Sequence, residues 1–517
     1  MIAGCGRQTR VEVGAREQIL HIGNGAEPKD LDPATQAAEI EYVIDTALFE
    51  GLVNIANDGD TILPGVAERW DVSPDGRTYT FHLRSDARWS DGGPVIADDF
   101  VYSFRRVFTP SMGCQNNVYG FMIKGSRAMN EGKDAALGVA AIDARTLRIE
   151  LEYRAPYLLY ILAGAPFVPV PRAVVERFGG GTRPGSPWTR PGKIVCNGPF
   201  ILSSWRPNQE VVATRNPYYW DARRTRLREI HFYPTDDVES EERAFRAGQL
   251  HITYGLPTSK IASYRERGDP QLHVTPQLDT TYVLFNVTVP PFNDTRIRRA
   301  LALAIDREKI VPAVGKGSLD PAHSLTRPGT GGYTPPAVVD FDPSLAQKLL
   351  AEAGYPGGKG FPPATIRISR GPLATLVEAI QNSWQEVLGI NIGIEVQEQK
   401  TFFDAIHSKD YHVAFTPFFY GVNAAETILM IAQGESLWND TGWKSPAFDQ
   451  AYHDASFAPD ETVRRAAFDR MERLIHDEAP YIPIGFLNQP HLISSKVRGW
   501  RDNALYAIDW RELWLEP

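Results

Sequence analysis

The residue types that most often carry chemistry are scattered along this 517-residue chain and form no known catalytic motif. The patterns HExxH, GxSxG, the Walker A loop and GxGxxG after a strand are all absent from the sequence. The closest histidines between an expected helix and an expected strand, His407 and His412, have no third ligand nearby. We therefore expect no enzyme, no metal site and no cofactor, although distant segments could still assemble a site that the sequence does not display.

The densest group of reactive or stacking side chains is an aromatic run formed by Phe415, Phe418, Phe419 and Tyr420, just before Gly421. Alternation along a strand would bury only one face of such a run. Two interpretations stay open, a packed strand and a platform on which a ligand stacks. The chain as a whole contains 11 Trp, 20 Tyr and 24 Phe, and large ligand cavities favour rigid apolar walls of this kind.

The composition is typical of a soluble globular protein, with 43% hydrophobic and 23% charged residues. The formal net charge of -9 argues against nucleic acid and anionic membranes as partners, because both require a basic surface. No segment approaches the roughly 20 apolar residues of a transmembrane helix. Two of the three cysteines, Cys114 and Cys196, are expected to be buried thiols, and a disulfide between them stays open.

The first residues, Ile2-Ala3-Gly4-Cys5, are similar to the lipobox at which a bacterial signal peptide is cut before an acylated cysteine. The basic and apolar regions of a signal peptide do not precede them, so we expect a longer precursor. Residues 6–17 are polar and suit a flexible tether. We expect a lipid on Cys5 to hold the protein at a membrane surface outside the cytoplasm.

The body of the chain must position these residues, and it alternates β-rich runs with amphipathic helices, the pattern of an α/β protein. Its length requires more than one core. The Gly/Pro-rich residues 179–192 form the clearest internal boundary. The predicted strands are residues 79–84, 147–152, 200–205, 211–215, 229–233, 390–396 and 481–486. One predicted helix begins at residue 97, and the others cover residues 296–305, 344–353, 373–388 and 461–478.

Short segments in a fixed order run through nearly the whole chain. They include EPKDLDP (27–33), LFEGL (48–52), LPGVAERW (63–70), FHLR (81–84), WSDG (89–92), ADDF (97–100), NGPF (197–200), RNPYYW (215–220), FND (292–294) and KSPAFD (444–449). Each is weak alone, but their ordered recurrence over about residues 20–515 excludes chance. In these segments the chain resembles the dipeptide/oligopeptide/nickel-binding family of ABC-importer solute-binding proteins, and most of all its oligopeptide branch.

The resemblance implies a two-lobe periplasmic-binding-protein type II fold, with an extra α/β domain inserted in the first lobe. Mapped onto this sequence, the lipobox and tether are residues 1–17 and the inserted domain is residues 51–191. Two crossing strands, near 278–288 and 484–490, would form a hinge about which the lobes close on a ligand. Lobe one would consist of 18–50, 192–278 and 488–517, and lobe two of 279–487.

In that branch an aspartate of the second lobe usually receives the ammonium group of the peptide, and here its position falls on Gly421. Phe415 falls where a basic residue can meet a peptide carboxylate. Enclosing an unpartnered ammonium costs several kcal/mol, or about a thousandfold in affinity. Either another acid such as Glu39 or Glu426 replaces the missing one, or the ligand lacks a free α-amine. We hypothesise that zwitterionic di- and tripeptides bind weakly and that ligands uncharged at the amino end bind well.

The resemblance and the aromatic run together nominate a set of ligand contacts. Asn116 and Asn117 lie where this branch touches its ligand, and Tyr254 and His407 fall at or beside contact positions. The full candidate set is Glu39, Asn116, Asn117, Tyr254, Phe403, His407, Phe415, Phe418, Phe419, Tyr420, Gly421, Asn423, Trp443 and Phe486.

The resemblance implies a monomeric extracytoplasmic protein, in the periplasm or on the outer face of the cell membrane. It would capture a peptide or peptide-sized ligand and pass it to the permease subunits of an ABC importer. One alternative ligand is an oligosaccharide or a sugar or opine-like conjugate, which the aromatic run could stack. A surface signalling receptor or an enzyme on the same scaffold also stays open, because fold alone does not decide function. A nickel or haem ligand is disfavoured by the lack of a histidine cluster.

Overall fold

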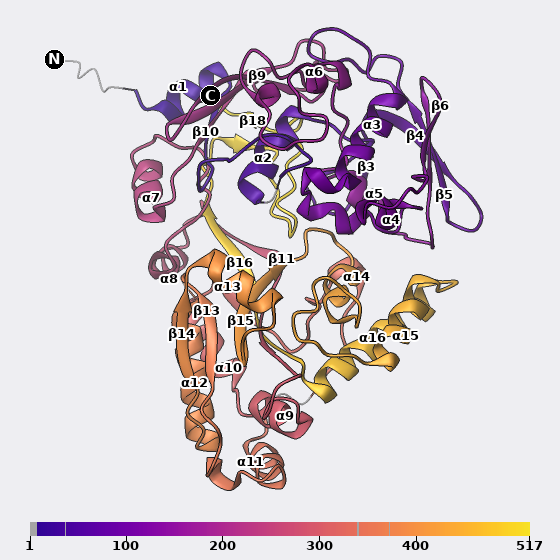
Figure 1. The fold of residues 1–517 in the computed structure, drawn as a ribbon. Helices are drawn as coiled ribbons and strands as arrows, with labels where there is room; N and C mark the ends of the chain where they lie inside the picture. The colour runs from indigo at the N-terminus through magenta and orange to yellow at the C-terminus, as the bar shows by residue number, and fades with distance from the viewer. Residues whose placement is uncertain (1–7, 37, 339–340, 372) are drawn as a thin grey trace, which may run out of the picture. The chain divides into compact units, whose positions relative to one another are not determined.

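The computed structural model describes residues 8–36, 38–338, 341–371 and 373–517, so the lipobox and its Cys5 lie outside the described residues. The chain divides into two compact units. Unit 1 consists of Met1–Thr275 and Pro490–Pro517, and unit 2 of Pro276–Gln489. Both units mix helices with sheets, which confirms the predicted α/β class (Figure 1). The further separation of residues 51–191 as an inserted domain stays a prediction. The flexible tether predicted at residues 6–17 is wrong for its second half, because residues 10–17 form a capped helix that buries Gly14 and Ala15.

The first sheet of unit 1 has the strand order β1-β10-β9-β8. Strand β1 runs parallel to β10, and the other neighbours are antiparallel. Apolar residues on its strands, among them Leu20, Ile22 and Phe232, are buried in one core with Trp510 from the end of the chain. The strands are β1 (Ile19–Gly23), β8 (Phe200–Arg206), β9 (Glu210–Arg215) and β10 (Glu229–Tyr233), and the accompanying helices are α1 (Arg10–Glu17), α2 (Glu39–Leu48), α7 (Val238–Arg246) and α8 (Thr258–Glu266).

A second, antiparallel sheet of unit 1 has the order β4-β5-β7-β6. Tyr79, Phe81 and Leu83 alternate with less buried residues along its second strand, as the sequence predicts for residues 79–84. Helix α3 (Ala97–Phe108) follows this strand and buries Phe100 and Phe104. The strands are β4 (Ala67–Val72), β5 (Thr78–Leu83), β6 (Val139–Asp143) and β7 (Thr146–Glu150), beside the small hairpin of β2 (Val53–Ile55) and β3 (Ile62–Pro64).

Helix α3 is anchored by a buried ion pair. The two terminal nitrogens of Arg106 donate to the carboxylate of Asp32 at 3.1 and 2.7 Å, and the two side chains are 2% and 1% exposed. The indole of Trp188 donates to the same carboxylate at 3.0 Å, and Arg106 also donates to the carbonyl oxygen of Gly180. Three segments distant in sequence are therefore joined at one charged centre.

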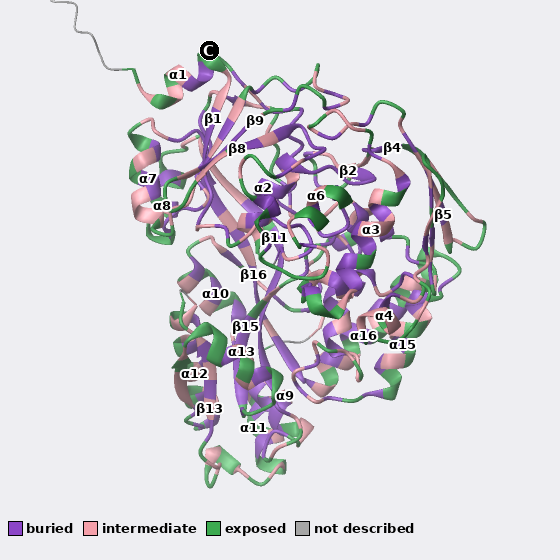
Figure 2. Ribbon diagram, turned by 45° about the horizontal axis from the view of Figure 1, so that its top comes forward, coloured by how far each residue is buried: buried purple, intermediate pink, exposed green. Residues whose placement is uncertain are grey.

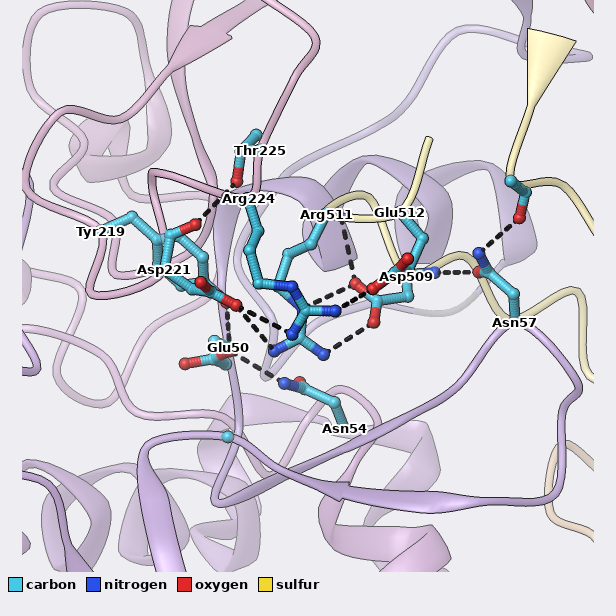
Figure 3. Close-up of polar contacts among 12 residues, drawn as sticks. Glu50, Asn54, Asn57, Tyr219, Asp221, Arg224, Thr225, Asp509, Arg511 and Glu512 are labelled. Carbon is cyan, nitrogen blue, oxygen red and sulfur yellow. Dashed lines mark hydrogen bonds and ion pairs between the residues drawn. The ribbon is translucent and has the colours of Figure 1, made fainter. Parts of the chain in front are cut away.

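A second buried polar cluster joins the last residues of the chain to its first third (Figure 3). The Arg511 guanidinium donates two hydrogen bonds of 2.7 Å to the carboxylate of Asp509. Glu50 accepts hydrogen bonds from the hydroxyl of Tyr219 and the side-chain amide of Asn54, at 2.5 and 2.8 Å. Burial raises the pKa of Glu50, and the charge of Arg511 opposes that rise.

Three histidine rings meet on β1 and its neighbours. The ring of His21 stacks on that of His251 with centroids 5.6 Å apart and lies 5.1 Å from that of His231. The backbone N–H of His21 donates to Nδ1 of His251 at 3.0 Å, which leaves Nε2 of His251 to donate to the carbonyl oxygen of Val11 at 3.2 Å. Burial lowers the pKa of His21 to about 3 and that of His251 to about 4, so both rings are neutral.

Unit 2 is built on a six-stranded sheet with the order β12-β16-β11-β15-β13-β14. Its central strands are buried along most of their length, whereas helix α12 buries only one face (Figure 2). The strands are β11 (Leu272–Phe285), β12 (Leu319–Pro321), β13 (Thr365–Ser369), β14 (Gly393–Gln397), β15 (Val413–Phe419) and β16 (Tyr481–Leu492), and the helices include α9 (Thr295–Leu303), α10 (Arg307–Gly315), α11 (Pro343–Glu352), α12 (Ala374–Leu388), α13 (Gln399–His407), α15 (Pro446–Ser456) and α16 (Glu461–Glu478).

Strands β11 and β16 contain the two points at which the chain passes between the units, 275/276 and 489/490. The helices predicted at 373–388 and 461–478 are confirmed within one residue. The strand predicted at 390–396 begins later, at Gly393. Ile390 and Ile392 are buried in the core of unit 2, but they lie before the residues of β14 that pair with β13. They directly follow Gly389, whose left-handed conformation ends the preceding helix.

None of the described helices is long and apolar enough to cross a membrane. Within the described ranges, no group of three or more His, Cys, Asp or Glu side chains has an arrangement that could hold a metal ion.

Cys114 and Cys196 are free, buried thiols, and burial raises the pKa of each to about 12. Since the thiolate is the reactive form, we expect neither to react with a thiol reagent such as Ellman's reagent in the folded protein at neutral pH. Both should react once guanidinium chloride unfolds unit 1. Rapid labelling of Cys114 or Cys196 in the native protein, measured by absorbance and distinguished from labelling of Cys5 by peptide mass spectrometry, would contradict this burial.

Candidate functional site

The candidate contact residues fall into two sets, and each set is described within its own unit. Unit 1 holds Glu39, Asn116, Asn117 and Tyr254. Unit 2 holds the aromatic run on β15 and the remaining candidates.

Glu39 is the first residue of helix α2 and is half-buried. Its Oε2 accepts a 3.5 Å hydrogen bond from the hydroxyl of Tyr254, whereas its Oε1 is buried with no hydrogen-bond partner among the described residues. Burial raises the pKa of Glu39 to about 7, although the bond from Tyr254 lowers it. Glu39 and Tyr254 are therefore candidates for contact with a polar or cationic group of a ligand.

The two asparagines lie on the short 3-10 segment Gln115–Gly120. The side-chain amide of Asn116 donates to the backbone oxygen of Gln36 at 3.0 Å. That of Asn117 donates to Oδ1 of Asn130 at 2.7 Å, and Asn117 is buried. Both amide groups therefore hold loops of unit 1 together, and Asn116 is the more exposed of the two.

The aromatic run divides between core and surface. Phe415 is buried opposite Val283 in the core of unit 2, which favours the packed-strand interpretation for this residue. Phe419, at the end of the same strand, is 43% exposed, and Phe418 is half-buried. The platform interpretation therefore applies only to the end of β15.

An aromatic chain extends from Phe418 across unit 2. Its ring lies 5.6 Å from the indole of Trp438 in a T-shaped contact, and Trp438 makes a similar contact with His407 at 6.4 Å. His407 stacks on Phe403 at 5.9 Å. Asp440 accepts a 2.9 Å hydrogen bond from Nδ1 of His407, and this bond raises the pKa of the imidazole. The structure thus brings Phe403, His407 and Phe418 together, as the candidate set requires.

Trp438 is absent from the sequence-derived set, although it links these rings. Its Nε1 is buried with no hydrogen-bond partner among the described residues. Trp438 lies in the short segment 437–440, after the aromatic run, and no periodicity in the sequence around it indicates a site.

The other unit 2 candidates are mostly committed to internal contacts. Trp443 donates to Glu478 at 2.6 Å, and Phe486 is buried with the guanidinium carbon of Arg327 at 5.4 Å from its ring centroid. Tyr420 is fully buried and its hydroxyl accepts from the backbone N–H of Arg327. Oδ1 of Asn423 accepts from the backbone N–H of Gly331 at 2.7 Å, whereas Gly421 is exposed with φ at 51°.

The acids of unit 2 differ sharply in their partners. Glu426, named from the sequence as a replacement acid, forms a buried ion pair of 2.5 Å with Arg464, so its charge is already compensated. Asp279 on β11 was missed by sequence reasoning. It is 7% exposed, and its Oδ1 has no hydrogen-bond partner among the described residues.

The cavity beside the Glu50 cluster of unit 1 has a volume of about 50 Å³. It is lined by Glu50, Tyr219, Asp509 and Arg511 among others, which already hydrogen-bond one another or their neighbours. A space of this size holds a few water molecules and no peptide-sized ligand.

Comparisons with known proteins agree over nearly the whole chain. The family described as "Bacterial extracellular solute-binding proteins, family 5 Middle" matches residues 61–440. The periplasmic oligopeptide-binding protein OppA of Escherichia coli is 34% identical over 501 residues, which cover 94% of this chain and 90% of OppA. The probable deoxycholate-binding periplasmic protein YgiS of Escherichia coli is 30% identical, with 94% and 91% of the two chains covered.

Among solved structures, the murein tripeptide binding protein MppA of Escherichia coli superposes with a TM-score of 0.85. The two proteins are 30% identical, and the match covers 96% of this chain and 98% of MppA. The fold is thus of the periplasmic-binding-protein type II class, as the sequence predicts.

Proposed function

The chain belongs to family 5 of the bacterial extracellular solute-binding proteins, and we propose that it captures a peptide or peptide-sized ligand and delivers it to an ABC importer. The observation that carries the proposal is its similarity, over more than nine-tenths of both chains, to MppA, a murein tripeptide binding protein. OppA, an oligopeptide-binding protein, is similar over comparable lengths.

The aromatic rings of unit 2 support a ligand with apolar or planar groups. Phe418 and Trp438 form an edge at which a side chain or ring of a ligand can stack. His407 and Asp440 beside them supply a hydrogen-bonding pair. Such a mixture of a rigid apolar surface and few polar groups is typical of small-molecule sites.

The partners follow from the same proposal. The protein would act as a monomer, bring its ligand to the permease subunits of the importer and perform no catalysis itself. It would work in the periplasm or on the outer face of the cell membrane, held there by a lipid on Cys5. Mass spectrometry of the amino-terminal peptide, from protein expressed with its full leader, tests the lipid.

A non-peptide ligand is the second candidate. It is favoured by the absence of charge at Phe415 and Gly421. It is also favoured by YgiS, a relative described as a probable deoxycholate-binding protein, at an identity close to that of OppA. An oligosaccharide or a sugar or opine-like conjugate belongs to this candidate class.

Native mass spectrometry of protein purified without denaturation is expected to show a retained ligand of peptide-like mass. Titration calorimetry with a panel of tripeptides then measures the affinity.

Trp438→Ala should weaken binding by about tenfold or more, because a stacking ring is lost from the site. Leu437→Ala is the matched control, since Leu437 precedes Trp438 in the chain and is itself 71% exposed. A retained sugar or steroid, with no binding of any peptide, would reject the peptide function.

A further inference from the structure

The carboxylate of Asp279 is buried in unit 2 without a partner that would explain it. Asp279 lies in the carboxyl-terminal half of β11, and only 7% of the residue is exposed. Its Oδ1 makes no hydrogen bond to any of the described residues. Burying a carboxylate without such bonds is costly, and native proteins retain few groups of this kind unless a role requires them.

The nearest positive charge does not pair with Asp279 directly. Burial raises the pKa of Asp279 to about 7, and the charge of Arg327 lowers it. The guanidinium of Arg327 is already bonded to the side chains of Asp320 and Asn488, at 2.7 and 2.9 Å, and to the backbone oxygen of Leu487 at 2.9 Å. No ion pair within 4 Å joins Arg327 to Asp279 among the described residues, so the acid is left for another cation.

The strand register places Asp279 beside Phe419, the exposed aromatic residue at the end of β15. Asp279 pairs with Phe419 and Thr280 with Phe418 across the antiparallel β11–β15 ladder. Directly opposed residues of such a ladder project to the same face, with Cβ atoms about 5 Å apart. The side chains of Asp279 and Phe419 are therefore neighbours on one face of the ladder, and Phe419 is 43% exposed.

The turn that follows Phe419 leaves room beside this pair. The backbone N–H of Tyr420 donates to the carbonyl oxygen of Leu278, so the ladder continues up to Gly421. A Cβ added to Gly421 would meet only the Phe419 ring, at 3.5 Å. The exposed glycine thus leaves open space beside the ring of Phe419, the residue that pairs with Asp279 across the ladder.

We propose that Asp279 receives a primary ammonium group of the ligand, with the adjoining alkyl or aromatic part of the ligand packed on Phe419. A charge-assisted bond from an ammonium would satisfy the buried oxygen and restore charge neutrality. The proposal deepens the proposed function and rests on it. It assigns the ligand to the class of peptide-sized primary amines. Of the two alternatives left open by Gly421, it favours another acid in place of the missing aspartate over a ligand whose amino end is blocked.

Other acids with a buried oxygen that has no hydrogen-bond partner among the described residues fit this role less well. Glu39 already accepts a hydrogen bond from Tyr254, and Glu426 is paired with Arg464. Asp45 in unit 1 has two unpartnered oxygens, but burial and the neighbouring acids Asp32 and Glu41 raise its pKa well above the usual range, so it is held in its neutral form.

The test is calorimetry with a tripeptide that binds the wild-type protein, its N-acetylated form, and the N-acetylated form carrying one lysine. We expect N-acetylation to weaken binding by at least about 30-fold, as does the loss of one partner of a buried charge pair. Asp279→Asn should weaken the free peptide by a similar factor and leave the acetylated peptide unchanged. Recovery of affinity by the lysine form identifies a side-chain amine as the source of the ammonium, and no recovery identifies the α-amine.

Two controls separate this proposal from its alternatives. Asp410→Asn removes the same charge from a side chain that is 82% exposed, before the opposite end of β15, and should change neither affinity. Glu39→Gln tests the acid predicted from the sequence. Two results would overturn the assignment of Asp279 and leave the peptide function standing. One is equal binding of the free peptide by Asp279→Asn and by the wild type. The other is tighter binding of the acetylated peptide than of the free peptide by the wild type. If no tripeptide binds the wild type at millimolar concentration, the peptide function fails and the assignment of Asp279 fails with it.

Discussion

Replacing Arg106 by methionine is expected to lower the free energy of unfolding of unit 1 by on the order of 3–5 kcal/mol. The substitution keeps much of the side-chain volume but leaves Asp32 buried and charged, with only Trp188 and nearby backbone groups as donors. Most of the lost stability then comes from the carboxylate of Asp32, which stays charged without its ion-pair partner, because both side chains are shielded from water.

Differential scanning calorimetry of the two-unit protein measures the effect as a downward shift of the unit 1 transition alone. Arg105→Met is the matched control, since Arg105 is the preceding residue of the same helix and is exposed. The double variant with Asp32→Asn should recover part of the loss, because the buried negative charge is then removed as well. Equal stability of the Arg106 and Arg105 variants would show that the ion pair does not hold unit 1 together.

Acidification from about pH 6.5 to pH 4.5 is expected to destabilise unit 1 through His21 and His251. Their pKa values, about 3 and about 4 when folded, lie below the unfolded value of 6.5. The unfolded state therefore binds more protons throughout this window, and stability falls as the pH falls. Each ring contributes up to about 3 kcal/mol at pH 4.5, and the contributions are not additive because the rings are neighbours.

Burial is the main reason why both rings resist protonation, and one hydrogen bond acts in the same sense at His251. Nδ1 of His251 accepts the backbone N–H of His21, so a proton there would break a bond inside unit 1. Glu39 and Glu241, whose pKa values are raised to about 7 by burial, act in the opposite sense over the same window. Urea unfolding of wild type and His21→Gln at several pH values isolates the histidine effect, since the acids are common to both proteins.

The His21→Gln variant should lose stability less steeply on acidification than the wild type. His412→Gln is the control, because His412 is an exposed residue of unit 2. Parallel curves for the wild type and the His21 variant would contradict the neutral, buried state of the ring.

Elements with strong local signals were predictable from the sequence. Helix α16 begins after Asp460, which accepts the backbone N–H of Val463, and it ends at Glu478, followed by the left-handed cap residue Ala479 and by Pro480. Helix α12 ends at Leu388, and the next residue, Gly389, is its left-handed cap. The strand at residue 390 was placed too early, because buried isoleucines do not distinguish a ladder from an irregular segment of the core.

The candidate site was predictable only in part, for a related reason. The proximity of Phe403, His407 and Phe418 follows from neighbouring elements, helix α13 and strand β15, whereas Trp438 joins them through a loop. The position of Asp279 beside Phe419 depends on the register of two strands separated by about 130 residues of sequence. Hydrogen-bond satisfaction is a property of the folded protein, so no local pattern marks Asp279 as unpartnered.

The polar cluster around Arg511 has a consequence for how the protein is made. Gln18 exchanges two hydrogen bonds with the backbone of Leu515, and Asp509 and Arg511 lie in the same polar cluster as Asn57 and Glu50 (Figure 3). Translation finishes the whole of residues 276–489 before those partners exist. A chain that ends near residue 500 therefore contains every residue of unit 2 but lacks the segment that closes unit 1.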